Sequence, residues 1–209
     1  METSSIDKIS LSILDLEMNN LDKSLAEFKE LGIKSIHIDI IDTSFADNIS
    51  FSLKTVNEIL NYDFSFELHI MIKNPLKILS KLNIKKNTKI TVHSHVEEVK
   101  NLFSGRKDVY IGYALNPKDK VETIKSISCQ IDHVLVMTVY PGFGKQAMIE
   151  ECTEKIKSIK NLRIPVGVDG GVNQNNVHLV READYIVIGS ALTTAEDKRR
   201  ALQQIIYSL

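Results

Sequence analysis

Eight short apolar runs, rich in isoleucine and valine, alternate with longer amphipathic segments along the 209-residue chain. The runs lie near Lys8–Leu14, Ser35–Ile40, Ser65–Ile70, Lys89–Val92, Val109–Tyr113, His133–Met137, Ile164–Val168 and Tyr185–Ile188. Continuous runs of branched residues are typical of strands that are buried on both faces. Strands that alternate with helices form a parallel sheet, because each parallel connection needs a crossover that a helix usually provides.

Apolar side chains recur at helical spacing in the segments between these runs. The stripes are Leu21, Leu25, Phe28 and Leu31; Val56, Ile59 and Leu60; Leu76, Ile78, Leu79 and Leu82; Ile156 and Ile159; Val177 and Val180; and Leu202, Ile205 and Ile206. Eight strand–helix repeats predict a closed (β/α)8 TIM barrel that forms one domain over residues 1–209. This fold typically takes ~250 residues, and the present chain has 209, so the loops of this barrel should be short.

The alternative fold is an open, doubly wound sheet. That fold usually carries a glycine-rich turn after its first strand. Here the corresponding segment, ILDLEMNN at residues 13–20, has no glycine, which favours the barrel.

Composition narrows the classes of partner and compartment. The chain is 43% hydrophobic and 25% charged, with a formal net charge of −1, so the basic surface needed to bind nucleic acid is not expected. No apolar run approaches the ~20 residues of a membrane helix. The segment Met1–Lys8 lacks the apolar core of a signal peptide. The two cysteines, Cys129 and Cys152, are far apart, so we expect no disulfide framework and a cytoplasmic protein.

Catalytic groups in a barrel lie at the C-terminal ends of the strands, so polar residues there are informative. His37 and Asp39 are two residues apart and face the same side of one strand; His69 ends the next, and Asp169 ends the seventh. Each has a structural alternative: a buried His–Asp hydrogen bond, a core histidine, or an aspartate that caps a helix starting near Asn173. Together, two imidazoles and two carboxylates at one barrel end predict a divalent-metal site.

Glycine-rich loops follow the sixth, seventh and eighth predicted strands. In this fold, the loops after strands seven and eight and the start of a short extra helix commonly bind phosphate through backbone N–H groups. The candidate residues are Gly142, Phe143, Gly144 and Lys145 after strand six, Gly170 and Gly171 after strand seven, and Gly189 and Ser190 after strand eight. Each loop alone could be an ordinary turn. Ser12, in the first strand, could bond a substrate or a catalytic carboxylate.

At these residues the sequence resembles the ribulose-phosphate 3-epimerase family. The resemblance extends from ISLSIL near residue 9 to VIGSAL near residue 192. It includes, in order, HIDIIDTSFADN, in which Ala46 is not part of the match, then LHIMIKNP, TVH, ALNP, MTVYPGFGKQ, VDGGV and the IGSA of the final motif. The resemblance implies a homo-oligomeric enzyme of the pentose phosphate pathway, although the family includes both dimers and hexamers.

The resemblance also assigns roles by position. It makes His37, Asp39, His69 and Asp169 metal ligands, and Asp39 and Asp169 the acid and base that exchange the proton. It places a further set of residues around the substrate: Ser12, His69, Met71, Met137, Gly142, Phe143, Gly144, Lys145, Gly170, Gly171, Gly189 and Ser190. The implied cofactor is one divalent ion, zinc first, with iron(II), manganese or cobalt as alternatives.

The implied reaction inverts C3 of D-ribulose 5-phosphate to give D-xylulose 5-phosphate. A proton leaves one face of the carbon and another arrives on the opposite face, which suits two carboxylates from well-separated strands. Loss of the proton next to the carbonyl builds an enediolate, and a divalent metal would stabilise that charge.

The sequence departs from the family pattern around the substrate. The family usually has proline at Leu11 and Asp47 and glycine at Lys145. At residues 41–45 the family usually has Met, Asp and Gly, followed by His or Asn and then Phe. This sequence has Ile41, Asp42, Thr43, Ser44 and Phe45 at those positions. A six-carbon substrate such as allulose 6-phosphate, and a non-catalytic sugar-phosphate sensor, therefore remain alternatives.

Two other reaction classes are less compatible with the strand ends. Metal-dependent decarboxylation or aldol cleavage usually needs a strand-end lysine, and the predicted strand ends offer none. A metal hydrolase often needs a second metal at a carboxylate-rich site. The sequence shows no such site, and only His93 and His95 keep this alternative open.

Overall fold

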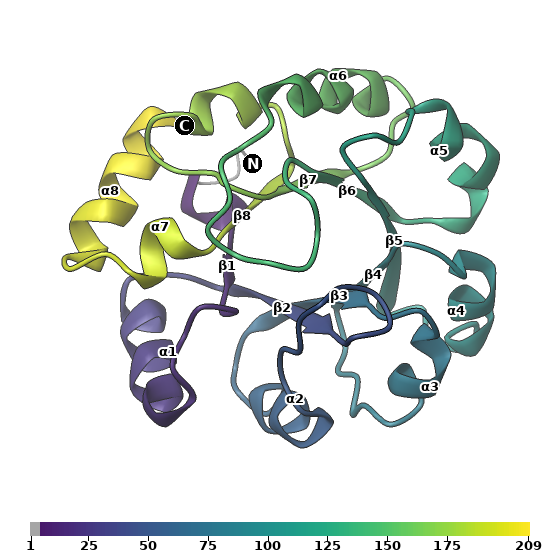
Figure 1. The fold of residues 1–209 in the computed structure, drawn as a ribbon, viewed down its shortest axis with the longest axis horizontal. Coiled ribbons are helices and arrows are strands. Elements are labelled where there is room, and N and C mark those ends of the chain that lie inside the picture. Colours follow the sequence, from purple (N-terminus) through teal and green to yellow (C-terminus); the bar gives the residue numbers. More distant parts are fainter. Residues whose placement is uncertain (1–4) are drawn as a thin grey trace.

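The computed structural model describes residues 5–209, which form a closed barrel of eight parallel strands (Figure 1). The strands are β1 (Ile9–Ser12), β2 (Ser35–Ile41), β3 (Ser65–Met71), β4 (Thr88–Val92), β5 (Val109–Leu115), β6 (His133–Met137), β7 (Val166–Asp169) and β8 (Tyr185–Ile188). The barrel predicted from the alternating apolar runs is confirmed, and the open sheet is excluded because β1 pairs with β8. Two predictions concern residues that the structure does not describe in full. They are the absence of a signal-peptide core in Met1–Lys8 and the single domain over residues 1–209, and residues 1–4 lie outside the described part of the chain.

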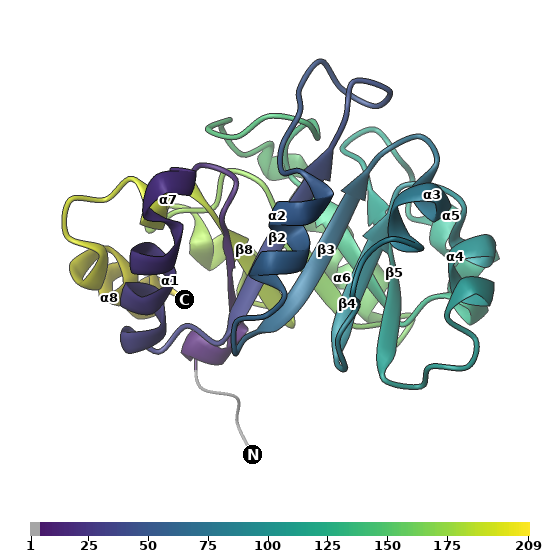
Figure 2. The same cartoon turned by 90° about the horizontal axis from the view of Figure 1, so that it is seen from below.

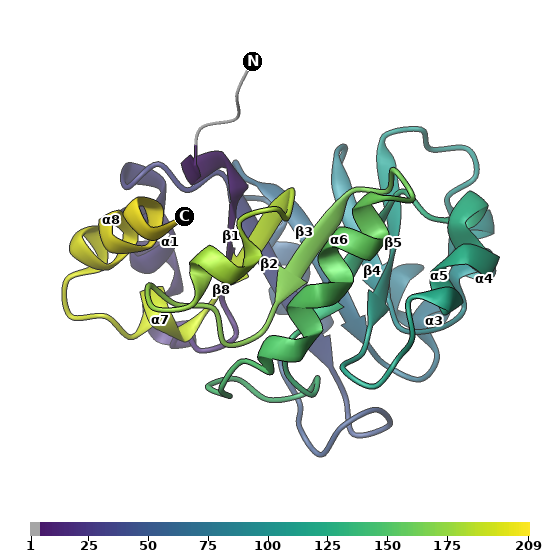
Figure 3. The same ribbon diagram turned by 90° about the horizontal axis from the view of Figure 1, so that it is seen from above.

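Helices surround the barrel. They are α1 (Leu21–Glu30), α2 (Leu53–Ile59), α3 (Pro75–Leu79), α4 (Val96–Leu102), α5 (Glu122–Ile127), α6 (Glu154–Lys160), α7 (Ser190–Thr193) and α8 (Lys198–Ser208). Short 3-10 turns are η1 (Ser5–Lys8), η2 (Met18–Asn20), η3 (Ser128–Gln130), η4 (Glu150–Thr153) and η5 (Val177–Val180). Figure 3 shows α6 lying across the outer face of the strands. None of the helices over residues 5–209 has both the length and the hydropathy needed to cross a bilayer.

Local signals explain where several helices begin. The Ser52 side chain accepts a hydrogen bond from the Thr55 N–H and caps α2, and Asp197 accepts one from the Arg200 N–H to cap α8. Pro75 occupies the first turn of α3, where a missing N–H costs nothing.

The segment after β7 forms the 3-10 turn η5 instead of a full α-helix. The Asn176 side chain donates a hydrogen bond to the Gly171 carbonyl and accepts one from the Asn173 N–H. These side-chain bonds replace backbone hydrogen bonds that a helix would form at the same carbonyl and N–H groups. Asp169 caps no helix in the described chain, because its carboxylate faces His37 and His69.

Two apolar regions hold the barrel together. The larger one lies between strands and helices and includes the outward-facing Ile36, Ile38 and Ile40 of β2. A smaller cluster lies inside the barrel: Ala114, Leu135, Met137, Tyr185 and Val187. The rest of the interior is unusually polar, because it buries Ser12, His37, Asp39, Glu67, His69, Thr91 and His133.

The long loops after β2 and β6 project from one end of the barrel, opposite the end that carries the 3-10 turn η1 (Figure 2). Asn48 in the first loop donates a 2.7 Å hydrogen bond to the Gly142 carbonyl in the second. This end carries the C-terminal ends of the strands, where catalytic groups lie in this fold.

Candidate metal centre

Four side chains from three strands converge at the C-terminal end of the barrel. His37 and Asp39 lie on β2, His69 lies on β3 and Asp169 ends β7. One ligand atom from each residue lies within 4.8 Å of the other three. Strand register brings Asp39 directly opposite His69, which is why residues 30 positions apart in sequence meet. The predicted cluster therefore exists as a spatial group.

Asp39 is the centre of the cluster. Its Oδ1 atom lies 3.2 Å from His37 Nε2 and 3.0 Å from His69 Nδ1, and its Oδ2 atom accepts a 3.0 Å hydrogen bond from Ser12. Asp169 Oδ2 lies 3.7 Å and 3.6 Å from the same two nitrogens. Two imidazole nitrogens and two carboxylate oxygens directed at one point form a donor set that suits a divalent cation.

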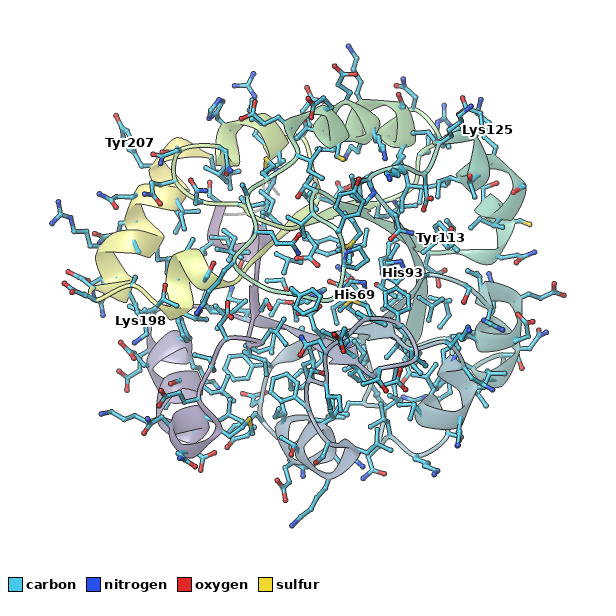
Figure 4. All side chains as sticks on the ribbon, viewed as in Figure 1. His69, His93, Tyr113, Lys125, Lys198 and Tyr207 are labelled. Atoms are coloured by element: carbon cyan, nitrogen blue, oxygen red, sulfur yellow. The ribbon has the colours of Figure 1, made fainter. Side chains whose placement is uncertain are left out.

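Each imidazole contacts a second side chain through the ring nitrogen that does not face the cluster. His37 Nδ1 lies 3.0 Å from the buried carboxylate of Glu67, and His69 Nε2 lies 2.9 Å from His93 Nε2. Figure 4 shows His69 and His93 next to each other near the barrel centre, and their rings stack with centroids 5.0 Å apart. Each ring thus presents one nitrogen to the cluster and uses the other for support, as metal-binding histidines do.

The two carboxyl groups of the cluster differ in pKa. Burial raises the pKa of Asp169 to about 6, and the nearby Asp39 charge adds to this effect. Burial acts in the same direction on Asp39, but His37 and His69 outweigh it and hold the pKa of Asp39 well below its usual value. Near pH 6, one carboxyl group is therefore ionised while the other still exchanges a proton.

The histidines also titrate differently. Burial opposes a charge on His37, but Asp39 and Glu67 outweigh burial and raise the pKa of His37 well above its ordinary value. Burial, together with His69, lowers the pKa of His93 to about 3. His93 is therefore neutral and can accept a hydrogen bond from His69.

A cavity that opens to solvent lies above this cluster. Its lining includes Ser12, Asp39, Met71, Met137, Gly142, Phe143, Gly144, Lys145, Asp169, Gly170, Gly171, Gly189 and Ser190. Every predicted substrate-contacting residue except His69 is in this lining. His69 and His37 are completely buried beneath the cavity floor, where they can reach a cation.

Close packing explains the two glycines after β7. A Cβ atom on Gly171, whose φ is 67°, would lie 2.5 Å from the Met148 backbone nitrogen. One on Gly170, whose φ is 125°, would lie 2.5 Å from Val139. These contacts and positive φ angles require glycine here.

The loop after β6 carries one strained position. Lys145 adopts a φ of 59°, in the left-handed region that glycine enters without cost. Gln146 ties this loop together by donating to the carbonyls of Tyr140 and Phe143 at 2.7 and 2.8 Å. Gly189 and Ser190 lead into α7, as the sequence predicted.

Sequence reasoning missed several residues around the site. Asp15, in the loop after β1, lines the cavity, and its carboxylate lies 3.0 Å from where a Gly144 Cβ would be. Glu67 and Thr91 lie beneath the cluster. Glu67 could have been found, because it precedes His69 by two residues and therefore faces the same side of the strand.

The fold and the site together define a (β/α)8-barrel enzyme with a His–Asp cluster able to hold a metal at the C-terminal end of its strands. The chain belongs to the ribulose-phosphate 3 epimerase family, which it matches over residues 8–193. The predicted family resemblance is confirmed, and with it the prediction of an isomerase of the epimerase type.

Individual relatives span nearly the whole chain. The chain is 36% identical to ribulose-phosphate 3-epimerase of Encephalitozoon cuniculi, covering 95% of this chain and 93% of the relative. It is 31% identical to the enzyme of the same name from Bacillus subtilis, covering 95% and 97%. A solved structure of 3-hexulose-6-phosphate synthase from Salmonella typhimurium superposes with a TM-score of 0.64 at 15% identity, covering 97% of this chain and 98% of that one. That last likeness concerns the fold alone.

Proposed function

We propose that this protein is a metal-dependent epimerase that inverts C3 of D-ribulose 5-phosphate to give D-xylulose 5-phosphate. The observation that carries the proposal is the pair Asp39 and Asp169, two carboxyl groups with oppositely shifted pKa values in one metal-capable cluster at the base of a glycine-lined cavity. The names of the relatives in Encephalitozoon cuniculi and Bacillus subtilis support the choice of substrate.

The two aspartates act as the acid and base. Asp39, the ionised carboxylate, accepts the C3 proton from one face, and Asp169, whose pKa is about 6, delivers a proton to the other. In the reverse reaction the roles exchange. Environments that separate the pKa values of two neighbouring carboxyl groups are typical of such pairs.

One divalent cation completes the site, held by His37, Asp39, His69 and Asp169. When bound, it would supply Lewis-acid stabilisation of the negative charge that develops next to the carbonyl. The two carboxylates offset the charge of the cation. Zinc suits this set of two nitrogen and two oxygen donors, with iron(II), manganese or cobalt as alternatives.

The glycine loops bind the phosphate at a distance from the reacting carbon. Backbone N–H groups of the loops after β7 and β8 hold the anion, and the exposed Lys145 adds attraction from the cavity rim. Phosphate binding of this kind positions C3 between the two aspartates and brings the loop 142–144 over the sugar, which excludes water from the enediolate.

The decisive experiment is proton NMR of D-ribulose 5-phosphate in D2O with zinc-loaded protein. Deuterium at C3 together with D-xylulose 5-phosphate is the expected result, and the Asp39→Asn variant should give neither. Exchange and product from allulose 6-phosphate alone would redirect the proposal to six-carbon ketose phosphates. Binding of either sugar phosphate without exchange, in a protein that takes up no metal, would support a sensor instead.

A further inference from the structure

We propose that Glu67, a buried carboxylate inside the barrel, is a positioning residue that determines which nitrogen of His37 is offered to the metal. Glu67 is 1% exposed and lies one layer below the cluster, on the same strand as His69. It does not line the substrate cavity, so it acts through His37 alone. The inference rests on the metal site of the proposed function.

Three side chains from three other strands approach the two oxygens of Glu67. His37 Nδ1 lies 3.0 Å from Oε2, while the hydroxyls of Thr91 and Tyr185 both donate to Oε1 at 2.7 Å. Both oxygens are thus engaged by potential donors, which makes Glu67 an ionised, acceptor-only carboxylate.

This pattern assigns the hydrogen on His37. An acceptor-only carboxylate next to Nδ1 requires that Nδ1 carries a hydrogen. Nε2 faces Asp39 at 3.2 Å and Asp169 at 3.7 Å, the two carboxylates that would share the cation with it, so Nε2 is the nitrogen that would give up its hydrogen when a cation binds. A metal-binding nitrogen must be the one without a hydrogen. Glu67 therefore selects Nε2 as the ligand and holds the ring plane toward the cluster.

His133 completes the network behind Glu67. Because Thr91 donates its only hydroxyl hydrogen to Glu67, it accepts from His133 Nε2 at 2.8 Å. His133 Nδ1 is buried and has no hydrogen-bond partner among the described residues. The hydrogen bonds are thus oriented consistently toward Glu67.

Two strand glycines make room for this network. A Cβ atom on Gly112 of β5 would lie 2.1 Å from the His133 ring, and one on Gly167 of β7 would lie 2.1 Å from the Tyr185 ring. Any side chain at these positions would displace the rings. The interior of the barrel is therefore shaped around the partners of Glu67, as well as around the metal ligands.

The second histidine ligand shows the opposite arrangement. His69 presents Nδ1 to the cluster, and its Nε2 meets His93, a neutral ring, instead of a carboxylate. The two imidazoles thus use different nitrogens. A buried ionic network usually contributes little net stability over apolar packing of the same volume, so orienting His37 gives the burial of Glu67 a functional reason.

Zinc affinity provides the first test. Metal-free Glu67→Gln, which keeps the shape but removes the charge, would be titrated with zinc against a chromophoric chelator. Loss of such a supporting carboxylate should weaken binding roughly 10–100-fold. Thr91→Val is the matched control, because it removes one bond to the same carboxylate without contacting His37, and it should lose clearly less. Equal affinity of Glu67→Gln and the wild type, or an equal loss in both variants, would overturn the role of Glu67.

Cadmium NMR provides a second test that needs no variant. In 15N-histidine protein loaded with 113Cd, we expect scalar coupling to Nε2 of His37 and to Nδ1 of His69. Coupling to Nδ1 of His37 would overturn the inference while leaving the metal site intact. A wild-type protein that binds neither zinc nor cadmium would overturn the metal site itself, and this inference with it.

Discussion

Asp39 and Asp169 flank the same ring nitrogen of His37, 3.2 Å and 3.7 Å away, yet their pKa values are displaced in opposite directions. Burial acts on both carboxyl groups alike. The difference arises because His37 and His69 lie within hydrogen-bonding distance of Asp39, whereas Asp169 stands slightly farther from both histidines. Position within one small cluster is thus enough to separate an ionised base from a group that exchanges its proton near pH 6.

Replacing either aspartate should stop turnover while the barrel survives. We expect Asp39→Asn and Asp169→Asn each to reduce kcat by roughly 10²–10⁴-fold, the usual contribution of a positioned acid or base. Steady-state epimerase assays measure the loss, and circular dichroism checks the fold. Asp63→Asn, an exposed residue paired with Lys29, serves as the control. Near-normal activity in either cluster variant would eliminate the two-base mechanism.

Metal binding should stabilise the fold. A ligand at about 100 times its Kd adds about 2.7 kcal/mol to the free energy of unfolding, which for a domain of this size corresponds to a rise in Tm of roughly 5–10 °C. Differential scanning fluorimetry with and without zinc measures the shift, and His69→Gln should lose most of it. An identical shift in His69→Gln would mean that zinc binds elsewhere.

The pKa of Asp169 predicts a pH dependence for the metal-free protein. Its folded pKa of about 6 exceeds the ordinary 3.8, so the stabilising contribution is fully present below pH 3.8 and is lost as pH rises through 6. Asp169→Asn removes this loss. The Tm difference, variant minus wild type, should therefore increase between pH 5 and pH 7.5 in the presence of a chelator. A flat difference would show that Asp169 is already ionised at pH 5.

Lys145 should affect substrate binding more than turnover. It is exposed at the cavity rim, so Lys145→Gly should raise KM roughly 2–5-fold, in keeping with the small energies of exposed charges. Lys145→Asn, which removes the charge but tolerates the left-handed φ of 59°, should show the same KM increase, whereas Lys145→Arg should not. An effect of Lys145→Gly on kcat alone would instead indicate that the loop controls a conformational step.

The sequence by itself determined the barrel and the four members of the cluster. In β2 (Ser35–Ile41), for example, Ile36, Ile38 and Ile40 pack toward the helices. This apolar pattern lies within a few consecutive residues, so it can be recognised in the sequence. His37, Asp39, His69 and Asp169 could be found because the fold places strand ends together, whatever their separation along the chain.

The tertiary structure decided everything that depends on neighbouring strands. Glu67 acquires its partners from β2, β4 and β8, and the opposite pKa shifts of Asp39 and Asp169 arise from differences of less than 1 Å in their distances to shared nitrogens. The use of Nε2 by His37 and Nδ1 by His69 likewise follows from what lies behind each ring. Hydrogen bonds and charge interactions vary steeply over such distances, and spacing along the chain does not encode them.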